Sequence, residues 1–369
     1  MANFTCPYCY SGYDKRKIKY VCPDCGTEAA PTGKEPIKCQ SGHCGGLATK
    51  RVCPVQLCER DIPRMALDTP NLLFSIIGVS TSGKTDYITT MLDELLNIEE
   101  LRLAMSHQTN ETRDHQKNNK RNLYELGIPN QATDRGYAVS QIWYIRNLAQ
   151  ARRGSVPAYT FTIYDGSGED HNEDMTLAQY IKSSEAFIIV LDPLILDRVQ
   201  DFVDPAVMGN SNRNTENTFN ANEIVESLVN RIKEIKGIPA TKPINMPVAV
   251  VLTKFDTIMN HPKLNNATVK NKNISAIEGG KVKEEVFEQI HGEIEFWLRS
   301  IGETSFINSL DGSFAKIDRK GNIKERYYNF FGVSSYGSSP ESPTEVPRIE
   351  PHRVLDPLLW LFKKKKFID

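Results

Sequence analysis

A glycine-rich segment constrains the fold of this chain more than any other feature: Gly78-Val79-Ser80-Thr81-Ser82-Gly83-Lys84-Thr85. An apolar run at 72–77 precedes it, and a helical pattern at 91–96 follows it. Strand, glycine loop and helix form the context that the phosphate-binding motif G-x-x-x-x-G-K-S/T requires. A loop that merely joins a strand to a helix is disfavoured, because Gly-Lys-Thr stands in register between the correct flanks.

The residue types of this loop indicate how it would hold phosphate. Glycines let backbone N–H groups turn inward around phosphate oxygens, and the helix N-terminus adds partial positive charge. We expect Lys84 to reach the β- and γ-phosphates of a nucleotide, and the Thr85 hydroxyl to ligate Mg²⁺. The other loop residues expected to bind the nucleotide are Gly78, Ser80, Thr81, Ser82 and Gly83.

All eight cysteines lie within the first 58 residues, and they form four pairs: Cys6/Cys9, Cys22/Cys25, Cys39/Cys44 and Cys53/Cys58. A short Cys-x-x-Cys turn places two thiolates on one face of a loop, which suits tetrahedral Zn²⁺. We predict two Cys₄ zinc sites, the first from the first two pairs and the second from the last two. A cross-braced arrangement, in which the first and third pairs share one ion, stays open.

A disulfide framework is the alternative to zinc. The N-terminus has no apolar segment that resembles a signal peptide, and no apolar run is long enough to span a bilayer. We therefore expect the cytosol, where thiols stay reduced and clustered cysteines more often bind metal.

The cysteine-rich region, residues 1–62, is too small to build a core without metal. Its basic residues and tyrosines could bind single-stranded nucleic acid by charge and stacking. A solvated face or a protein contact is favoured instead, because the charge run is short. Lys+Arg 45 against Asp+Glu 46 gives a net charge of -1, so any nucleic-acid surface would be local.

A second candidate site lies after an alternating strand at 159–164, where the chain reads Asp165-Gly166-Ser167-Gly168-Glu169. A carboxylate at the end of a parallel strand beside the phosphate loop can hold Mg²⁺, so we assign Asp165 to this ion. The Gly168 amide is expected to bond the γ-phosphate.

The polar stretch 106–136 predicts a long loop or a pair of surface helices. In a nucleotide switch, this is where the first mobile loop belongs. Thr133 is the candidate for the threonine that senses the γ-phosphate through Mg²⁺, and Thr109 and Thr112 are the alternatives.

Base recognition is predicted after the buried strand at 248–252, where Thr253-Lys254-Phe255-Asp256 follows. The Asp256 carboxylate can accept hydrogen bonds from N1–H and the exocyclic amine of guanine, whereas adenine leaves it unpaired. The Lys254 stem would lie along the base plane. Backbone N–H groups near Ser334 and Ser335, after the last strand, could meet the guanine carbonyl.

These four elements, GVSTSGKT at 78–85, DGSG at 165–168, TKFD at 253–256 and VSS at 333–335, resemble a Ras-like P-loop GTPase of the translation-factor-related (TRAFAC) class. The resemblance covers residues 70–362. The cysteine-rich front end, the DGSGED turn and the closing segment 353–360 look similar to bacterial double-GTPase proteins of conflict systems.

The resemblance implies GTP or GDP with Mg²⁺ as ligands, and catalytic roles for Lys84, Thr85, Asp165, Gly168 and Thr133. The sequence departs from the pattern of this family at two positions. Thr253 stands where many relatives have Asn, which keeps a hydrogen-bonding side chain. Glu169 stands where small Ras-like proteins place the Gln that orients water, so hydrolysis is expected to be slow or to depend on a partner.

The expected fold is an α/β P-loop NTPase: a doubly wound, mostly parallel sheet with helices on both faces, preceded by a zinc-ribbon module. We expect a linker at 63–71 and a GTPase domain at 72–345 with insertions at 106–136 and 195–244. A C-terminal helix within 346–369 would pack on that domain, with a basic tail that is too short to favour membrane anchoring.

The predicted activity is hydrolysis of GTP as a molecular switch, with a protein partner at the switch loops or zinc ribbons. Two alternatives remain at this point. The chain could be a scaffold that binds GTP without hydrolysing it, or a zinc-ribbon nucleic-acid-binding protein that nucleotide regulates.

Overall fold

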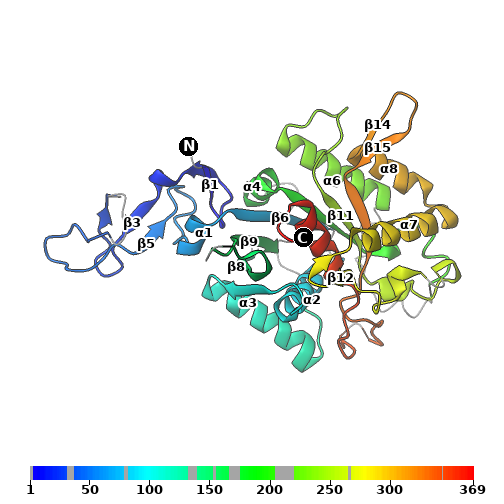
Figure 1. Ribbon diagram of the computed structural model, residues 1–369, viewed down its shortest axis with the longest axis horizontal. Helices are drawn as coiled ribbons and strands as arrows, with labels where there is room; N and C mark the ends of the chain where they lie inside the picture. Colours follow the sequence, from blue (N-terminus) through cyan, green and yellow to red (C-terminus); the bar gives the residue numbers. More distant parts are fainter. Residues whose placement is uncertain are drawn as a thin grey trace.

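The computed structural model describes residues 3–30, 37–78, 82–131, 139–152, 155–165, 175–203, 220–264, 267–342 and 344–369. Figure 1 shows a large sheet domain and, beside it, a small module made from the N-terminal residues. The sheet domain holds the main hydrophobic core, and the module has two small cores of its own.

A seven-stranded sheet in the order β16-β11-β10-β6-β9-β8-β7 forms the centre of the large domain. The strand β8 runs antiparallel to both of its neighbours, and the pairings among the first five strands are parallel. The strands are β6 (Asn71–Gly78), β7 (Leu103–His107), β8 (Val139–Asn147), β9 (Ala158–Asp165), β10 (Ala186–Leu191), β11 (Val248–Leu252) and β16 (Tyr328–Gly332).

The apolar runs explain the central strands. Every residue of β10 and β11 is buried, as expected for parallel strands covered on both faces. The predicted strands at 72–77, 159–164 and 248–252 are therefore confirmed. The edge strand β7 was not predicted, because its five residues are only partly buried or exposed and carry no clear apolar alternation.

Helices lie on both faces of this sheet, which confirms the predicted doubly wound α/β class (Figure 1). Phe74 of β6 contacts Phe362 of α9 on one face, whereas the next residue, Ser75, bonds Ser184 after α4 on the other. The helices are α1 (Arg64–Asp68), α2 (Lys84–Asn97), α3 (Asn110–Lys120), α4 (Met175–Ser183), α6 (Ala221–Lys236), α7 (Glu284–Ile301), α8 (Thr304–Phe314) and α9 (Asp356–Lys364).

Short elements complete the chain. A π-helical turn, Arg121–Leu126, continues α3. Part of the polar stretch 106–136 is therefore helical, as in the second of the two alternatives, a pair of surface helices. Two hairpins, β12 (Ile277–Glu278) with β13 (Lys281–Val282) and β14 (Ala315–Ile317) with β15 (Ile323–Arg326), flank α7 and α8.

The N-terminal module contains two small sheets, β1-β2 and β4-β3-β5. In the second sheet β5 pairs antiparallel with β3, although 28 residues separate them between Val21 and Lys50. The strands are β1 (Asn3–Thr5), β2 (Gly12–Asp14), β3 (Lys19–Val21), β4 (Glu28–Ala29) and β5 (Lys50–Val52).

The C-terminal helix α9 packs on the domain core, since its residues from Asp356 to Phe362 are buried. Two lysines of the basic tail form ion pairs within the chain, Lys364 with Glu284 and Lys365 with Glu185. Among the described residues, no helix has the length and apolar content needed to cross a bilayer.

The end of β16 requires glycine. A Cβ atom at Gly332 would lie 2.6 Å from the ring of the fully buried Phe255. We expect Gly332→Ala to lower the free energy of unfolding by about 1–3 kcal/mol, because the ring would have to move within a packed core. Urea denaturation measures this change. The control is Gly292→Ala in α7, where a Cβ meets nothing within 4 Å and about 1 kcal/mol of stabilisation is expected. Equal stability of the two variants would contradict the packing argument.

Candidate functional site

The candidate nucleotide site lies at one edge of the central sheet. The parallel strands β6, β9, β10, β11 and β16 all end at this edge. The strand β6 lies between β9 and β10. After β6 the chain forms β7, β8 and β9 on one side of it and then crosses to β10 on the other side, so the strand order reverses at β6. Such a switch point opens a crevice beyond the carboxyl ends of the strands, where ligands of α/β sheets bind.

The phosphate loop begins at this switch point. A Cβ atom at Gly78 would lie 2.5 Å from the Val190 carbonyl oxygen, so only glycine allows β6 to approach β10 this closely. Gly83 has a φ of 75° and is the N-cap of α2, and Lys84 is the first residue of that helix. Ser80 and Thr81, also predicted to bind nucleotide, lie outside the described residues.

The predicted magnesium ligands lie together. Thr85 Oγ1 is 3.4 Å from Asp165 Oδ1, although the two residues are 80 positions apart in sequence. Asp165 Oδ2 is buried without a hydrogen-bond partner among the described residues, and the His115 Nε2 atom of α3 is 3.7 Å away. A hydroxyl and a buried carboxylate oxygen that accepts no hydrogen bond from the described residues fit the oxygen ligands that Mg²⁺ prefers.

The predicted γ-phosphate residues Thr133, Gly168 and Glu169 lie outside the described residues. The two alternatives to Thr133 lie at the start of α3 and take part in its hydrogen bonds. Thr109 caps the helix by accepting a hydrogen bond from the Thr112 N–H, and Thr112 Oγ1 accepts one from the Ile142 N–H of β8. Both hydroxyl oxygens therefore accept hydrogen bonds from the backbone of the protein.

The predicted base motif is joined directly to the phosphate loop. Thr253 Oγ1 donates to the Ser82 carbonyl at 2.7 Å and lies 3.1 Å from the Leu191 carbonyl. A hydroxyl thus ties the end of β11 to the phosphate loop and to the end of β10.

Lys254 lies above the phosphate loop. Its backbone is left-handed, with a φ of 49°, and its Cε atom is 3.9 Å from the Cβ position of Gly83. Its Nζ atom is 2.7 Å from the buried carboxylate of Asp192, directly after β10. Asp192 carries no recognisable motif, and its place at the end of a buried strand, like that of Asp165, is the only signal of a role that the sequence offers.

The predicted guanine reader, Asp256, faces the segment that follows β16. Ser339 Oγ donates to Asp256 Oδ2 at 2.8 Å. The Ser334 N–H donates to the His352 carbonyl, and Ser334 Oγ accepts from the Gly337 N–H. The Ser334 N–H is thus engaged within the protein, so the predicted hydrogen bond to the guanine carbonyl now concerns the adjacent Ser335 N–H.

The buried carboxylate of Asp86, the residue after Thr85, further links the start of α2 to the segment that follows β16. Asp86 accepts hydrogen bonds from the Tyr336 hydroxyl and from the backbone and side-chain nitrogens of Asn130. Burial raises the pKa of Asp86, and these donors oppose the increase. Asp86 therefore joins α2, the segment before Thr133 and the segment after β16, a role that local sequence did not indicate.

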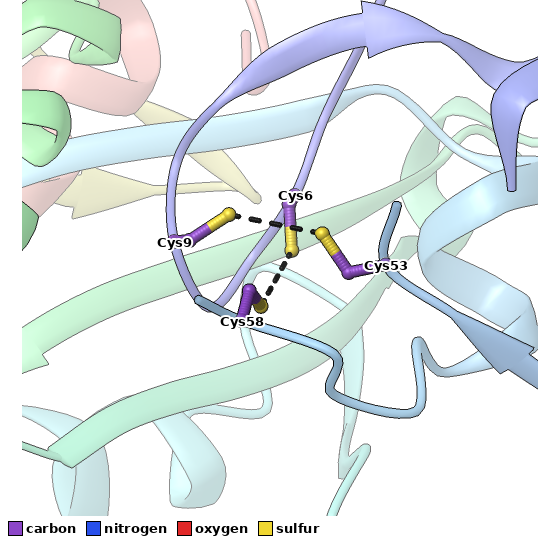
Figure 2. Close-up of side chains that lie close together, drawn as sticks. All are labelled: Cys6, Cys9, Cys53 and Cys58. Atoms are coloured by element: carbon purple, nitrogen blue, oxygen red, sulfur yellow. Dashed lines mark hydrogen bonds between the residues drawn. The ribbon is translucent and has the colours of Figure 1, made fainter. Parts of the chain in front are cut away.

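The eight cysteines form two groups of four among the described residues. By their nesting in the sequence, we name Cys6, Cys9, Cys53 and Cys58 the outer cluster, and Cys22, Cys25, Cys39 and Cys44 the inner cluster. Figure 2 shows the four sulfur atoms of the outer cluster pointing toward one another. The sulfur–sulfur distances of 4.0 and 3.8 Å in the outer cluster, and 3.7 and 3.4 Å in the inner, lie near the roughly 3.8 Å edge of a tetrahedral Zn–S₄ site.

The predicted pairing of the cysteines was wrong. The first pair joins the fourth, and the second joins the third, so neither the sequential nor the cross-braced arrangement forms. The antiparallel pairing of β3 with β5 explains this nesting. Val21 lies opposite Lys50 at one end of the ladder, near the inner cysteines, and Lys19 lies opposite Val52 at the other end, beside Cys53.

In each cluster, a neighbouring group donates a hydrogen bond to one of the sulfur atoms. The Tyr13 hydroxyl donates to Cys53 Sγ, and the Ser41 N–H donates to Cys39 Sγ. A Cβ atom at Gly46 would lie 3.3 Å from Cys44 Sγ and 2.5 Å from Asp24 Oδ2, so glycine keeps the inner cluster open. These donors and this close approach fit two Zn²⁺ ions.

Neither a protein-family model nor a curated protein matches the sequence. Among solved structures, the chain is similar to the S. cerevisiae Ski7 GTPase-like domain bound to GDP and inorganic phosphate, with 15% identity and a TM-score of 0.34, over 81% of this chain and 50% of that chain. It is also similar to Methanosarcina barkeri Roco2 RocCORdC bound to GDP, with 14% identity and a TM-score of 0.28, over 80% of this chain and 48% of that chain.

A third similar structure is Sup35 complexed with GDP, with 11% identity and a TM-score of 0.24, over 73% of this chain and 38% of that chain. The chain thus spans half or less of the length of these three structures. At these values the roles of individual residues rest on the geometry of the site itself.

Proposed function

We propose that this chain binds GTP with Mg²⁺ and hydrolyses it to GDP and phosphate, acting as a molecular switch. The observation that carries the proposal is the 2.7 Å hydrogen bond from Thr253 Oγ1 to the Ser82 carbonyl. It links the loop that bears Lys84 to the loop that bears Asp256. A phosphate-binding lysine and a base-reading carboxylate at one sheet edge suit a purine nucleotide that lies across the switch point.

At the phosphate end, the N-terminus of α2 and the Lys84 ammonium would hold the β- and γ-phosphates. The Thr85 hydroxyl and the Asp165 carboxylate would hold Mg²⁺, which neutralises charge on the transferring phosphoryl group when it is bound. The 3.4 Å separation of these two side chains supports a shared ion.

At the base end, the Asp256 carboxylate would accept from the two guanine donors. Ser339 already donates to Asp256 Oδ2, which holds the carboxylate in one orientation. Lys254, paired with Asp192, would lie along the base. An adenine ring has no matching pair of donors, so it would leave the carboxylate unpaired at a cost in affinity.

For hydrolysis, Thr133 and the Gly168 amide would contact the γ-phosphate and Glu169 would face the attacking water. A carboxylate in this place repels phosphate unless it is paired or acts as a base. We therefore propose slow turnover that a protein partner accelerates by supplying positive charge to the switch loops. The resemblance to conflict-system GTPases further suggests a bacterial defence pathway in the cytosol, which is part of the same proposal.

The base assignment is tested by Asp256→Asn. We expect this variant to bind GTP about 10- to 100-fold more weakly, because an amide cannot accept from both guanine donors as a carboxylate does. Calorimetric titration of wild type and variant with GTP and ATP, each with Mg²⁺, measures the change. The control is Asp68→Asn in α1, a carboxylate that is 61% exposed and pairs with Arg64.

The outcome that would contradict the proposal is also visible in this titration. If the intact wild-type protein bound ATP as tightly as GTP, Asp256 would not read the base. Multiple-turnover release of phosphate, with and without candidate partners, then separates a GTPase from a scaffold that only binds GTP.

A further inference from the structure

One residue of the cysteine-rich module is buried in the core of the sheet domain. Tyr10 directly follows Cys9, is fully buried, and belongs to the main hydrophobic core. Its ring centroid lies 4.8 Å from that of Tyr180 in α4 and 5.9 Å from that of Tyr164 in β9. The outer cluster thus places an aromatic ring against the strand that ends in Asp165.

Hydrogen bonds hold Tyr10 in this position. Its hydroxyl bonds with Ser140 Oγ of β8 at 2.7 Å, and its carbonyl accepts from Ser183 Oγ of α4 at 2.8 Å. Tyr180, which contacts the ring, accepts from the Tyr164 N–H and donates to the Phe74 carbonyl of β6. Tyr10 therefore contacts a network that joins β6, β8, β9 and α4.

This network lies directly beside the predicted magnesium ligand. Tyr164 pairs with Ser140 in the β8–β9 ladder, and the next pair is Asp165 with Val139. Tyr10 thus contacts both members of the pair adjacent to Asp165. The module makes a second contact with this region through Arg60. Arg60 pairs with Glu111 of α3, which lies one helical turn before His115.

The outer cluster sets the conformation of Tyr10. The Tyr10 N–H donates to the Cys6 carbonyl at 2.9 Å, and the Cys6 N–H donates to the Ser11 carbonyl at 3.1 Å. This turn gives Tyr10 a φ of 56°, which a bulky residue rarely adopts without support. Metal at the outer cluster would supply that support, because a module of this size cannot hold a turn by its core alone.

We propose that Tyr10 is a positioning residue for Asp165, and that metal binding at the outer cluster is thereby coupled to Mg·GTP binding at the sheet edge. This inference rests on the proposed function. By linkage, GTP binding with Mg²⁺ would in turn favour the metal-bound conformation of the outer cluster. The N-terminal module is then part of the nucleotide site rather than a tethered addition.

The first test measures GTP affinity with and without Mg²⁺ in Tyr10→Phe and Tyr10→Ala. Tyr10→Phe keeps the ring and loses the bond to Ser140, so we expect about 5-fold weaker binding in Mg²⁺ and little change in EDTA. Tyr10→Ala removes the ring as well and is expected to lose at least about 10-fold in Mg²⁺. Tyr327→Phe is the control, because Tyr327 is only partly buried and its hydroxyl donates to Glu325.

A merely structural role for Tyr10 predicts a different result. It would lower affinity equally with and without Mg²⁺, or would lower the melting temperature and leave affinity unchanged, and either outcome overturns the inference. If the wild-type protein binds no GTP, the proposed function fails instead, so the two failures are distinguishable.

A second test needs no nucleotide. In the full chain, Cys9→Ser at the outer cluster is compared with Cys25→Ser at the inner cluster, and each variant is expected to lose one zinc. Hydrogen exchange of residues 158–165 reports on β9. We expect exchange there to increase at least about 10-fold more in the outer-cluster variant than in the inner-cluster variant, because only the outer cluster positions Tyr10. Equal exchange in the two variants would overturn the coupling.

Discussion

The Lys84→Ala variant is expected to lose nucleotide binding, with an affinity at least about 100-fold below that of the wild type. An ammonium that donates to two phosphate groups contributes charge-assisted hydrogen bonds, each worth about 1.5–3 kcal/mol. Alanine provides no donor, and the phosphate charge then lacks compensation from this side. Titration with GTP in the presence of Mg²⁺ measures the loss, which should affect GDP as well because the β-phosphate is also contacted.

The control for Lys84→Ala is Lys320→Ala, since Lys320 lies in the exposed turn between β14 and β15, away from the sheet edge. Both variants should unfold at the denaturant concentration of the wild type, because Lys84 begins a helix that alanine also favours. A Lys84→Ala protein that still binds GTP within about 3-fold of the wild type would exclude the phosphate-loop assignment.

Removal of zinc is the second change with a large expected effect. We expect two zinc ions per chain, and we expect a strong chelator to unfold residues 3–62. Structural zinc in such sites contributes about 10–16 kcal/mol of binding free energy, which far exceeds what the small cores of the module can supply. Elemental analysis gives the stoichiometry, and limited proteolysis with thiol labelling reports unfolding.

The sheet domain provides the internal comparison in the chelation experiment. The module contributes Tyr10 to the core of the sheet domain, whereas the two described cores of the module contain no residue of α6 to α9, so these helices should remain folded and resist proteolysis. If the purified protein held no zinc and its cysteines were paired as disulfides, the metal assignment would be excluded. A module that stayed protected after complete zinc loss would exclude the structural role of the metal.

Local patterns were sufficient to predict the strands and loops of the site. Continuous apolar runs such as that of β10 occur where a strand is buried on both faces, so they identify parallel strands without further information. Parallel strands end at a common edge, so Asp165 and Thr253 could be expected to lie close to Thr85 and Ser82 before any coordinates. Their separations of 3.4 and 2.7 Å agree with this expectation.

Other parts of the site could not be predicted, because they depend on which distant segments meet. Asp192, Asp86 and Ser339 carry no motif, and each gains its place from a contact that spans between 44 and 250 residues of sequence. Tyr10 appeared to be one of several tyrosines in a basic segment. Its contact with Ser140, 130 residues away, depends on how the module docks on the sheet.

Within the N-terminal module, the cysteines also combine a feature that local sequence predicts with one that depends on tertiary structure. Spacing alone determined that each pair forms a short turn with two converging sulfurs, because a few residues of backbone suffice to build such a turn. The choice of partner pair was decided only by the antiparallel ladder of β3 with β5, which brings the first and fourth pairs together at one end. Local geometry follows from neighbouring residues, whereas the meeting of distant residues follows from strand pairing and packing, which a linear pattern does not encode.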